Sequence, residues 1–370
     1  MNKKKRNLIL TAAAVLIAVV AIIVATTQSR SATFDQDYHI ADTSTITRIF
    51  IADKQDHHVT LQREADSSWV VDGQYAANQP LVDLLLETLR DMRIRQQVNK
   101  NAIPNAVNDL AARAIKVEVY QRTPLINLFG GRIQLFPRER LTVTYHVGRE
   151  TQDMLASFMY REGDKVPYII HIPGFRGFLT PRFPADPLKW RSHTIVDLDV
   201  WAIARVELTL PETPAESFAV VREGEGFAFE LLEPHRRVDG FDTARVAQML
   251  SSFTWLNFDE FASIVPNSFA DSCVSGAPRS ILTITDTAGH TTTLRTYIKY
   301  SNPDDLANMP DPEMYETFDL DRLYAIVRRS ADNSGSDVAS QDTVLIQYFT
   351  FDNILQPASY FLGKDIKLNQ

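Results

Sequence analysis

Arginine and phenylalanine residues are concentrated in one segment, residues 167–191, where a strand-like run meets a Pro-Gly turn. Arginine beside aromatic rings can bind an anionic ligand or a protein surface, because the guanidinium group stacks on a ring and still presents N–H donors. The same composition suits a hinge between two modules, held by aromatic packing and by internal arginine–carboxylate pairs, and we favour this structural role. If the segment binds, its candidate ligand- or partner-binding residues are Arg176, Arg182, Arg191, Phe175 and Phe178.

The residues that usually carry catalysis show no catalytic spacing. The single cysteine, Cys273, follows a polar stretch without a neighbouring activating base, so we expect a buried or half-buried thiol and not a nucleophile. The sequence contains neither a GxSxG nor an SxxK motif for an activated serine, and neither a P-loop nor a GxGxxG phosphate-binding motif. We therefore predict a protein that has no catalytic residues and no cofactor.

Potential metal ligands occur at unsuitable spacings. His57 and His58 are adjacent in a predicted turn, and adjacent residues of an extended chain point to opposite sides. Seven acidic residues lie between Asp304 and Asp321, but they lack the alternating ligands and the turn glycine of a calcium loop. The run from Asp332 to Asp337 comes closer to such a loop, yet it has no closing carboxylate, so we favour a polar loop tip. No metal site is predicted.

An unusually apolar insertion, Leu125–Pro137, interrupts the predicted strands of the first half of the chain. An apolar surface segment is costly unless it packs on something. The alternatives are its own module, the second module, a protein partner or the surface of a bilayer. We favour packing within the chain.

Period-2 and helical patterns define the elements that must position these residues. Strands are expected at 46–52, 58–63 and 69–71, because apolar and polar residues alternate there between turn residues. Asn78 is a plausible N-cap, and Leu81, Leu84, Leu85, Leu89 and Met92 form one apolar stripe of a helix that ends near residue 94. A short helix at 105–113 and a strand at 115–120 follow.

The same order of patterns returns about 160 residues later. Predicted strands at 203–209, 217–223 and 226–230 precede a helix that is capped by Asp242 and carries Val246, Met249, Leu250 and Phe253. Seven short matches in the same order favour a tandem duplication. We therefore predict an α+β fold with two modules, residues 46–199 and 200–370, each an antiparallel sheet with helices on one face.

Charge and hydropathy suggest a membrane protein. The 370-residue chain has a net charge of −8, yet residues 1–30 contain five basic residues and no acidic one. The acidic remainder argues against nucleic-acid binding. A basic tail, residues 1–7, precedes Leu8–Thr26, an uncharged apolar run long enough to span a bilayer as a helix. The alternative is a cleavable signal peptide, but this run is longer than a signal-peptide core and no good cleavage site follows it. We therefore favour an uncleaved transmembrane anchor, followed by a linker over residues 27–45. The predicted protein is a single-pass inner-membrane protein with a cytoplasmic N-terminus and a periplasmic body.

Several segments carry a family resemblance. The segments that carry it occur in this order: Ile126-Asn-Leu-Phe-Gly130, Tyr145-His-Val-Gly148, His171-Ile-Pro-Gly-Phe-Arg-Gly177 and Trp190-Arg191. The resemblance covers most of residues 33–330. In these segments the chain resembles the DUF4340 family, a bacterial membrane-anchored family of unknown function. The resemblance implies an envelope protein, with some relatives associated with ABC-type export or gliding machinery. It supplies no catalytic residues.

Two functions follow as expectations from the sequence. The first is a non-enzymatic, extracytoplasmic scaffold or accessory subunit of a bacterial envelope complex, with an envelope protein as partner. The alternative is a ligand-binding module that holds an envelope glycan, lipid or anion in a groove between the modules. An enzyme that acts on envelope polymers would need paired carboxylates in one cleft, which the sequence does not show.

Overall fold

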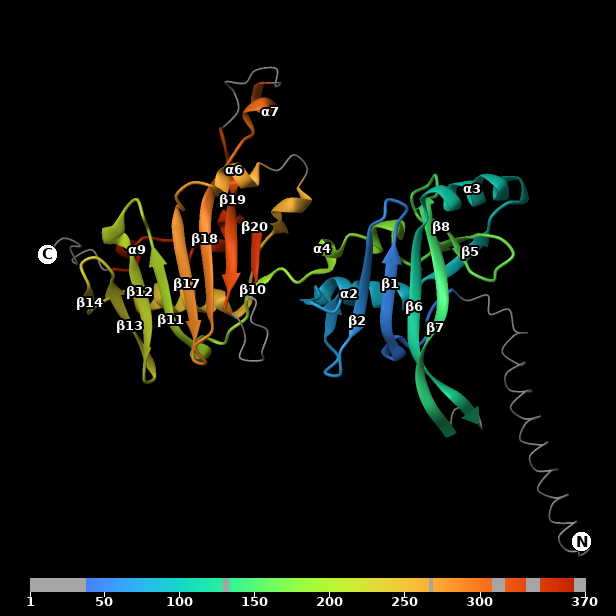
Figure 1. Cartoon of the computed structure of the whole chain (residues 1–370), viewed down its shortest axis with the longest axis horizontal. Coiled ribbons are helices and arrows are strands. Elements are labelled where there is room, and N and C mark those ends of the chain that lie inside the picture. Colours follow the sequence, from blue (N-terminus) through green and yellow to red (C-terminus); the bar gives the residue numbers. More distant parts are fainter. Residues whose placement is uncertain (1–37, 129–132, 266–268, 308–316, 331–339, 363–370) are drawn as a thin grey trace, which may run out of the picture. The chain divides into compact units, whose positions relative to one another are not determined.

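The computed structural model describes residues 38–128, 133–265, 269–307, 317–330 and 340–362 (Figure 1). The chain divides into two compact units, of which the first ends at Ser192 and the second begins at His193. Each unit contains one nine-stranded antiparallel sheet. The described chain is 44% strand and 26% helix, so sheets organise both units.

The first sheet follows the chain closely from one edge to the middle. Its strand order is β4-β3-β2-β1-β6-β7-β8-β9-β5, so β6 lies between β1 and β7. The strands are β1 (Ile46–Ala52), β2 (His58–Arg63), β3 (Trp69–Val71), β4 (Tyr75–Ala76), β5 (Arg93–Gln97), β6 (Ile115–Leu128), β7 (Ile133–Glu150), β8 (Ser157–Arg161) and β9 (Tyr168–His171). The predicted bounds of the first three strands are confirmed.

Helix α2 (Gln79–Asp91) contributes its apolar side chains to the core of the first unit. Asn78 caps it, because the Asn78 side chain accepts a hydrogen bond from the Leu81 amide, and Pro80 fits its first turn. Val82, Leu85 and Leu89 are fully buried with the β1 side chains Ile49 and Ile51. The predicted stripe is partly wrong, since Leu84 is exposed whereas Val82 and Leu86 are buried. Helices α3 (Ile103–Arg113) and α4 (Pro187–Trp190) complete the unit.

The second sheet has the same order of strands when each unit is read along its own chain: β14-β13-β12-β11-β17-β18-β19-β20-β16. Its strands are β11 (Ile203–Thr209), β12 (Phe218–Glu223), β13 (Gly226–Leu231), β14 (Arg236–Val238), β16 (Glu260–Phe261), β17 (Ser280–Asp286), β18 (Thr291–Tyr300), β19 (Phe318–Arg329) and β20 (Gln341–Gln347). A separate pair joins β10 (Thr194–Val196) to β15 (Leu256–Asn257). The two units therefore share one sheet topology. The tandem duplication, which concerns their ancestry, stays a prediction.

Helix α5 (Thr243–Ser251) of the second unit begins as the sequence predicted. The Asp242 side chain accepts hydrogen bonds from the amides of Ala244 and Arg245, and Val246, Met249 and Leu250 are buried. The other helices are short: α6 (Ala270–Val274), α7 (Pro303–Ala307), α8 (Tyr348–Phe351) and α9 (Ala358–Phe361).

The predicted α+β class is wrong, because two large antiparallel sheets dominate and the fold is mostly β. The main physical reason is that long strands such as β7 and β19 carry charged and polar residues on exposed positions, which weakened their signal in the sequence. The division after Ser192 also differs from the predicted one after residue 199, because β10 pairs with β15 of the second unit.

The predicted single-pass location is corrected as well. Within the described ranges, no helix combines the length and the apolar composition that crossing a bilayer requires. Helix α2, the longest described helix, has 13 residues, and a bilayer core needs about 20. The residues assigned to the cytoplasmic tail, to the Leu8–Thr26 anchor and to most of the linker lie outside the described part of the chain.

Candidate functional site

Strands β6 and β7 continue past the rest of the first sheet as a two-stranded ribbon (Figure 1). The β1 partner of β6 ends at the pair Ile46–Gln121, and the β8 partner of β7 ends at the pair Tyr145–Arg161. Beyond these points β6 and β7 pair only with each other, from Arg122–Glu139 to Leu128–Ile133. At about 3.3 Å per residue, the ribbon is about 20 Å long.

Described apolar side chains on this ribbon are exposed. Phe136 is 64% exposed, Leu125 49% and Leu135 44%. Within its own unit, the favoured expectation that the insertion packs on the chain is therefore wrong for these residues. The physical reason is that the ribbon has run past the strands and helices that could have covered it.

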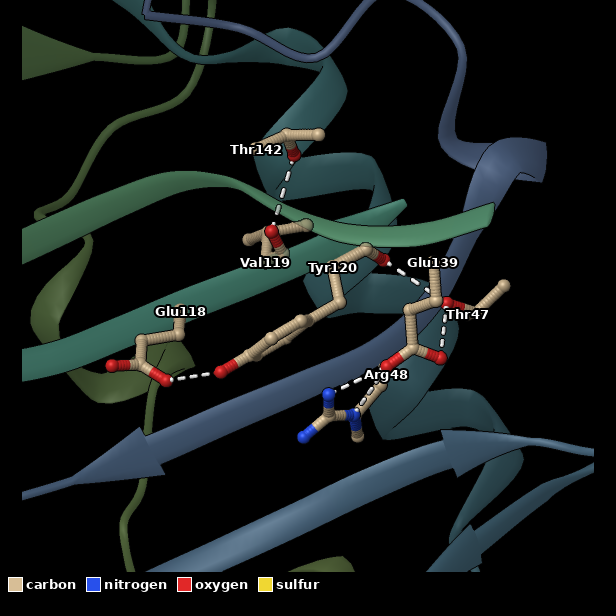
Figure 2. Close-up of polar contacts among 7 residues, drawn as sticks. All are labelled: Thr47, Arg48, Glu118, Val119, Tyr120, Glu139 and Thr142. Atoms are coloured by element: carbon tan, nitrogen blue, oxygen red, sulfur yellow. Dashed lines mark hydrogen bonds and ion pairs between the residues drawn. The ribbon is translucent and has the colours of Figure 1, made fainter. Parts of the chain in front are cut away.

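A polar network holds the base of the ribbon to strand β1 (Figure 2). The Arg48 guanidinium donates from Nε and Nη2 to one Glu139 oxygen, at 2.8 and 2.5 Å. The Thr47 hydroxyl donates to the other Glu139 oxygen at 3.1 Å. Arg48 and Glu139 are partly exposed, so the pair contributes at most about 1 kcal/mol and mainly fixes the position of the ribbon.

The same network continues along β6. The Arg48 guanidinium carbon lies 3.7 Å from the Tyr120 ring centroid, and the Tyr120 hydroxyl donates to Glu118 at 2.7 Å (Figure 2). Burial would raise the pKa of Glu118, but hydrogen bonds from Lys116 and Tyr120 outweigh it and hold this pKa below its usual range. The hydrogen bond to Glu118 raises the pKa of Tyr120. The network therefore keeps Glu118 ionised and the phenol protonated, which orients the Tyr120 ring under Arg48.

A groove of about 650 Å³ lies beside the ribbon base. Its lining includes Ser44, Arg63, Glu64, Arg122 and Pro137. Arg63 donates to the Ser44 carbonyl oxygen at 2.7 Å and stacks on Trp69, and burial lowers its pKa. The lining offers hydrogen-bond donors, acceptors and both signs of charge, which suits binding. It includes neither histidine nor cysteine, and its Glu139 is already ion-paired.

The arginine segment is mostly occupied by internal contacts. The Arg182 guanidinium donates to the Thr88 hydroxyl at 2.9 Å and lies 4.3 Å from the Phe175 ring centroid, and burial lowers the pKa of Arg182. Arg191 lies 3.9 Å over the Tyr75 ring instead. Arg176 is exposed and Phe178 is half-buried. The structure thus joins Arg182 to Phe175, gives Arg191 a different aromatic partner, and leaves the binding role of this segment a prediction.

The histidine pair closes a turn. The His57 ring Nδ1 lies 2.8 Å from an Asp53 carboxylate oxygen, and this hydrogen bond raises the pKa of His57. Burial would raise the pKa of Asp53, but the hydrogen bonds from the His57 ring and from two backbone amides lower it overall. His290 and Asp286 form the same contact at 2.9 Å in the second unit. Across the described ranges, no three His, Cys, Asp or Glu side chains are grouped as a metal site would require.

The predicted half-burial of Cys273 is confirmed, and the acidic runs are only partly described. The Cys273 thiol is free and half-buried against a small cluster that contains Tyr297 and Tyr324. Residues 308–316 of the first acidic run and all of residues 332–337 lie outside the described ranges.

Comparisons do not place the chain in a family. No protein-family model, curated protein sequence or solved structure matches it. The resemblance to the DUF4340 family therefore stays a prediction.

Sequence reasoning found the apolar insertion but missed the residues that hold it. Arg48 and Glu139 are 91 positions apart, so only the pairing of β1 with β6 and of β6 with β7 brings them together. One signal was available: Glu139 is the single acidic residue among the arginines that follow the insertion, which marks it as a partner for a distant cation.

Proposed function

We propose that the protein is a non-enzymatic scaffold or accessory subunit of a bacterial envelope complex, and that it uses the β6–β7 ribbon as its docking element. The observation that carries this proposal is a ribbon fixed at its base while its described apolar side chains remain exposed. A two-stranded ribbon alone is only marginally stable in water. A ribbon that extends beyond its sheet is therefore stabilised when a partner covers its apolar side chains.

The site chemistry supports binding over catalysis. A catalytic centre usually brings a nucleophile, a base and an orienting group within hydrogen-bond reach. The groove beside the ribbon presents hydroxyls, prolines and a mixture of charges instead. The resemblance to a family of envelope proteins supports the same class of function.

A shortened ribbon tests the proposal. Arg122 and Glu139 are register partners, so joining them through Asn-Gly in place of residues 123–138 closes a two-residue hairpin without shifting the sheet. We expect the shortened chain to keep its thermal unfolding temperature within a few degrees, because none of the deleted side chains that the structure describes is buried. We expect it to migrate at the size of the free chain in native separation of cell extracts in which the membrane lipids are retained, whereas the full chain migrates in a larger assembly.

The matched control changes the surface elsewhere. Phe349→Ser removes a side chain that is 92% exposed in the second unit and should leave the larger assembly intact. An equal size for the shortened and full chains, with both folded, would contradict the proposed role of the ribbon.

A further inference from the structure

The ribbon differs in charge from the protein that carries it. Residues 122–140 contain four arginines and one glutamate, a net charge of +3, in a chain whose net charge is −8. The only carboxylate of this segment, Glu139, is held by Arg48. Among the described residues, no carboxylate forms an ion pair with Arg122, Arg138 or Arg140, and all three side chains are exposed. The ribbon therefore offers unneutralised positive charge to a partner.

The arginines flank both faces of the ribbon. Arg138 and Arg140 are two positions apart on β7 and share one face, whereas Arg122 is the register partner of Glu139 and belongs to the other face. The exposed Leu125, Leu135 and Phe136 lie farther along the same ribbon. Apolar and aromatic residues bordered by cationic side chains match the interface of an anionic bilayer, where acyl chains lie beneath charged headgroups.

The backbone argues against a protein strand as the occupant. Pro124 and Pro137 are register partners, so neither offers an N–H group to a strand added at that level. Proline and charge on an exposed edge are common barriers to edge pairing. A second copy of this chain would meet the same barrier and the same positive charge.

The conformation of Phe136 also favours an apolar environment for its ring. Its φ is +55°, a left-handed conformation that is strained for a bulky aromatic residue, and its ring is largely exposed. Strain and exposure together are unfavourable in water. They are offset if the ring enters an apolar phase.

We propose that the three exposed apolar side chains named above insert into the interface of an anionic lipid bilayer, with Arg122, Arg138 and Arg140 on the headgroups. This inference rests on the proposed docking role of the ribbon and names its partner as a lipid surface.

The test places its readout on the ribbon itself. Residues 8–26 are apolar in sequence, so total binding of the full chain to vesicles would not report on the ribbon. An environment-sensitive fluorophore is therefore attached to Leu125→Cys in the full chain carrying Cys273→Ser. We expect a blue-shifted emission with vesicles of equal parts phosphatidylglycerol and phosphatidylcholine, and little change with phosphatidylcholine alone.

Two sets of variants separate lipid docking from misfolding and from net charge. Each arginine near an anionic surface contributes about five-fold in affinity. The double variant Arg138→Glu with Arg140→Glu should therefore raise the lipid concentration at half-maximal emission change at least ten-fold. Lys54→Glu with Lys165→Glu changes two exposed lysines of the same unit by the same charge. This variant should shift the lipid concentration at half-maximal emission change by less than two-fold. Phe136→Asn suits the left-handed conformation, so it should fold as well as the parent while weakening the response.

Three results would overturn the lipid assignment. They are no emission change with anionic vesicles, an equal change with phosphatidylcholine alone, and an equal loss in the lysine variant. An emission change that grows with protein concentration without vesicles would instead identify a second copy as the occupant. That outcome, or loss of the larger assembly without any lipid response, would leave the proposed docking role intact while refuting the lipid partner.

Discussion

The Trp190→Ala substitution is expected to lower the free energy of unfolding of the first unit by about 3–5 kcal/mol. Trp190 is fully buried in the main core of that unit, together with Leu179 and Phe183. Its indole N–H donates to the Pro184 carbonyl at 2.7 Å, and its own carbonyl accepts from the amide of Asn78, the N-cap of α2. Removing the ring leaves a cavity and breaks one of these contacts.

Thermal and urea unfolding measure this effect. Trp255 is 65% exposed in the second unit, so Trp255→Ala should change the free energy of unfolding by less than about 0.5 kcal/mol. A loss below 1 kcal/mol for Trp190→Ala would mean that the end of the arginine segment is not part of the core. The ligand-binding role of Arg176, Arg182 and Arg191 would then regain support.

The Asp164→Ala substitution is expected to cost about 3 kcal/mol, because it removes the acceptor of a buried network. The Tyr38 hydroxyl donates to Asp164 at 2.7 Å, and the Arg161 guanidinium lies 3.0 Å from the other oxygen. The Tyr145 hydroxyl donates to the Tyr38 carbonyl. Burial, followed by the hydrogen bond to Asp164, raises the pKa of Tyr38, so the phenol stays protonated and continues to donate.

A matched pair of variants identifies the source of this loss. Tyr38→Phe removes one hydroxyl and leaves the Arg161–Asp164 pair, so it should cost only about 1 kcal/mol. The double variant Tyr38→Phe with Asp164→Ala should cost less than the sum of the two single changes, because both act on one network. Strict additivity in urea unfolding would show that the two residues are not coupled.

Local elements were largely predictable from the sequence, since their signals are local. The alternation at Ile46–Ala52 and the Asn78 cap with Pro80 depend on adjacent residues, and the structure places β1 and α2 there. The role of Tyr38 was not predictable, because a polar lead-in gives no sign that one tyrosine reaches a carboxylate 126 positions later.

The exposure of the ribbon is the feature that the sequence pattern predicted least well. An apolar run bounded by prolines is normally buried, so packing within the chain was the natural expectation. Whether Leu125 and Phe136 are covered depends on where β1 and β8 end, which is a property of the sheet and not of the insertion. The Arg48–Glu139 pair depends on the same long-range pairing.

Photo-crosslinking from the ribbon tests the docking role most directly. A benzophenone amino acid at position 136 of the full chain should form one dominant adduct in growing cells, whereas the same group at the more exposed position 349 should not. A lipid adduct supports the bilayer partner, and a single protein adduct supports docking without it. Equal, diffuse labelling from positions 136 and 349 would contradict the account, because it would show that nothing specific covers the ribbon.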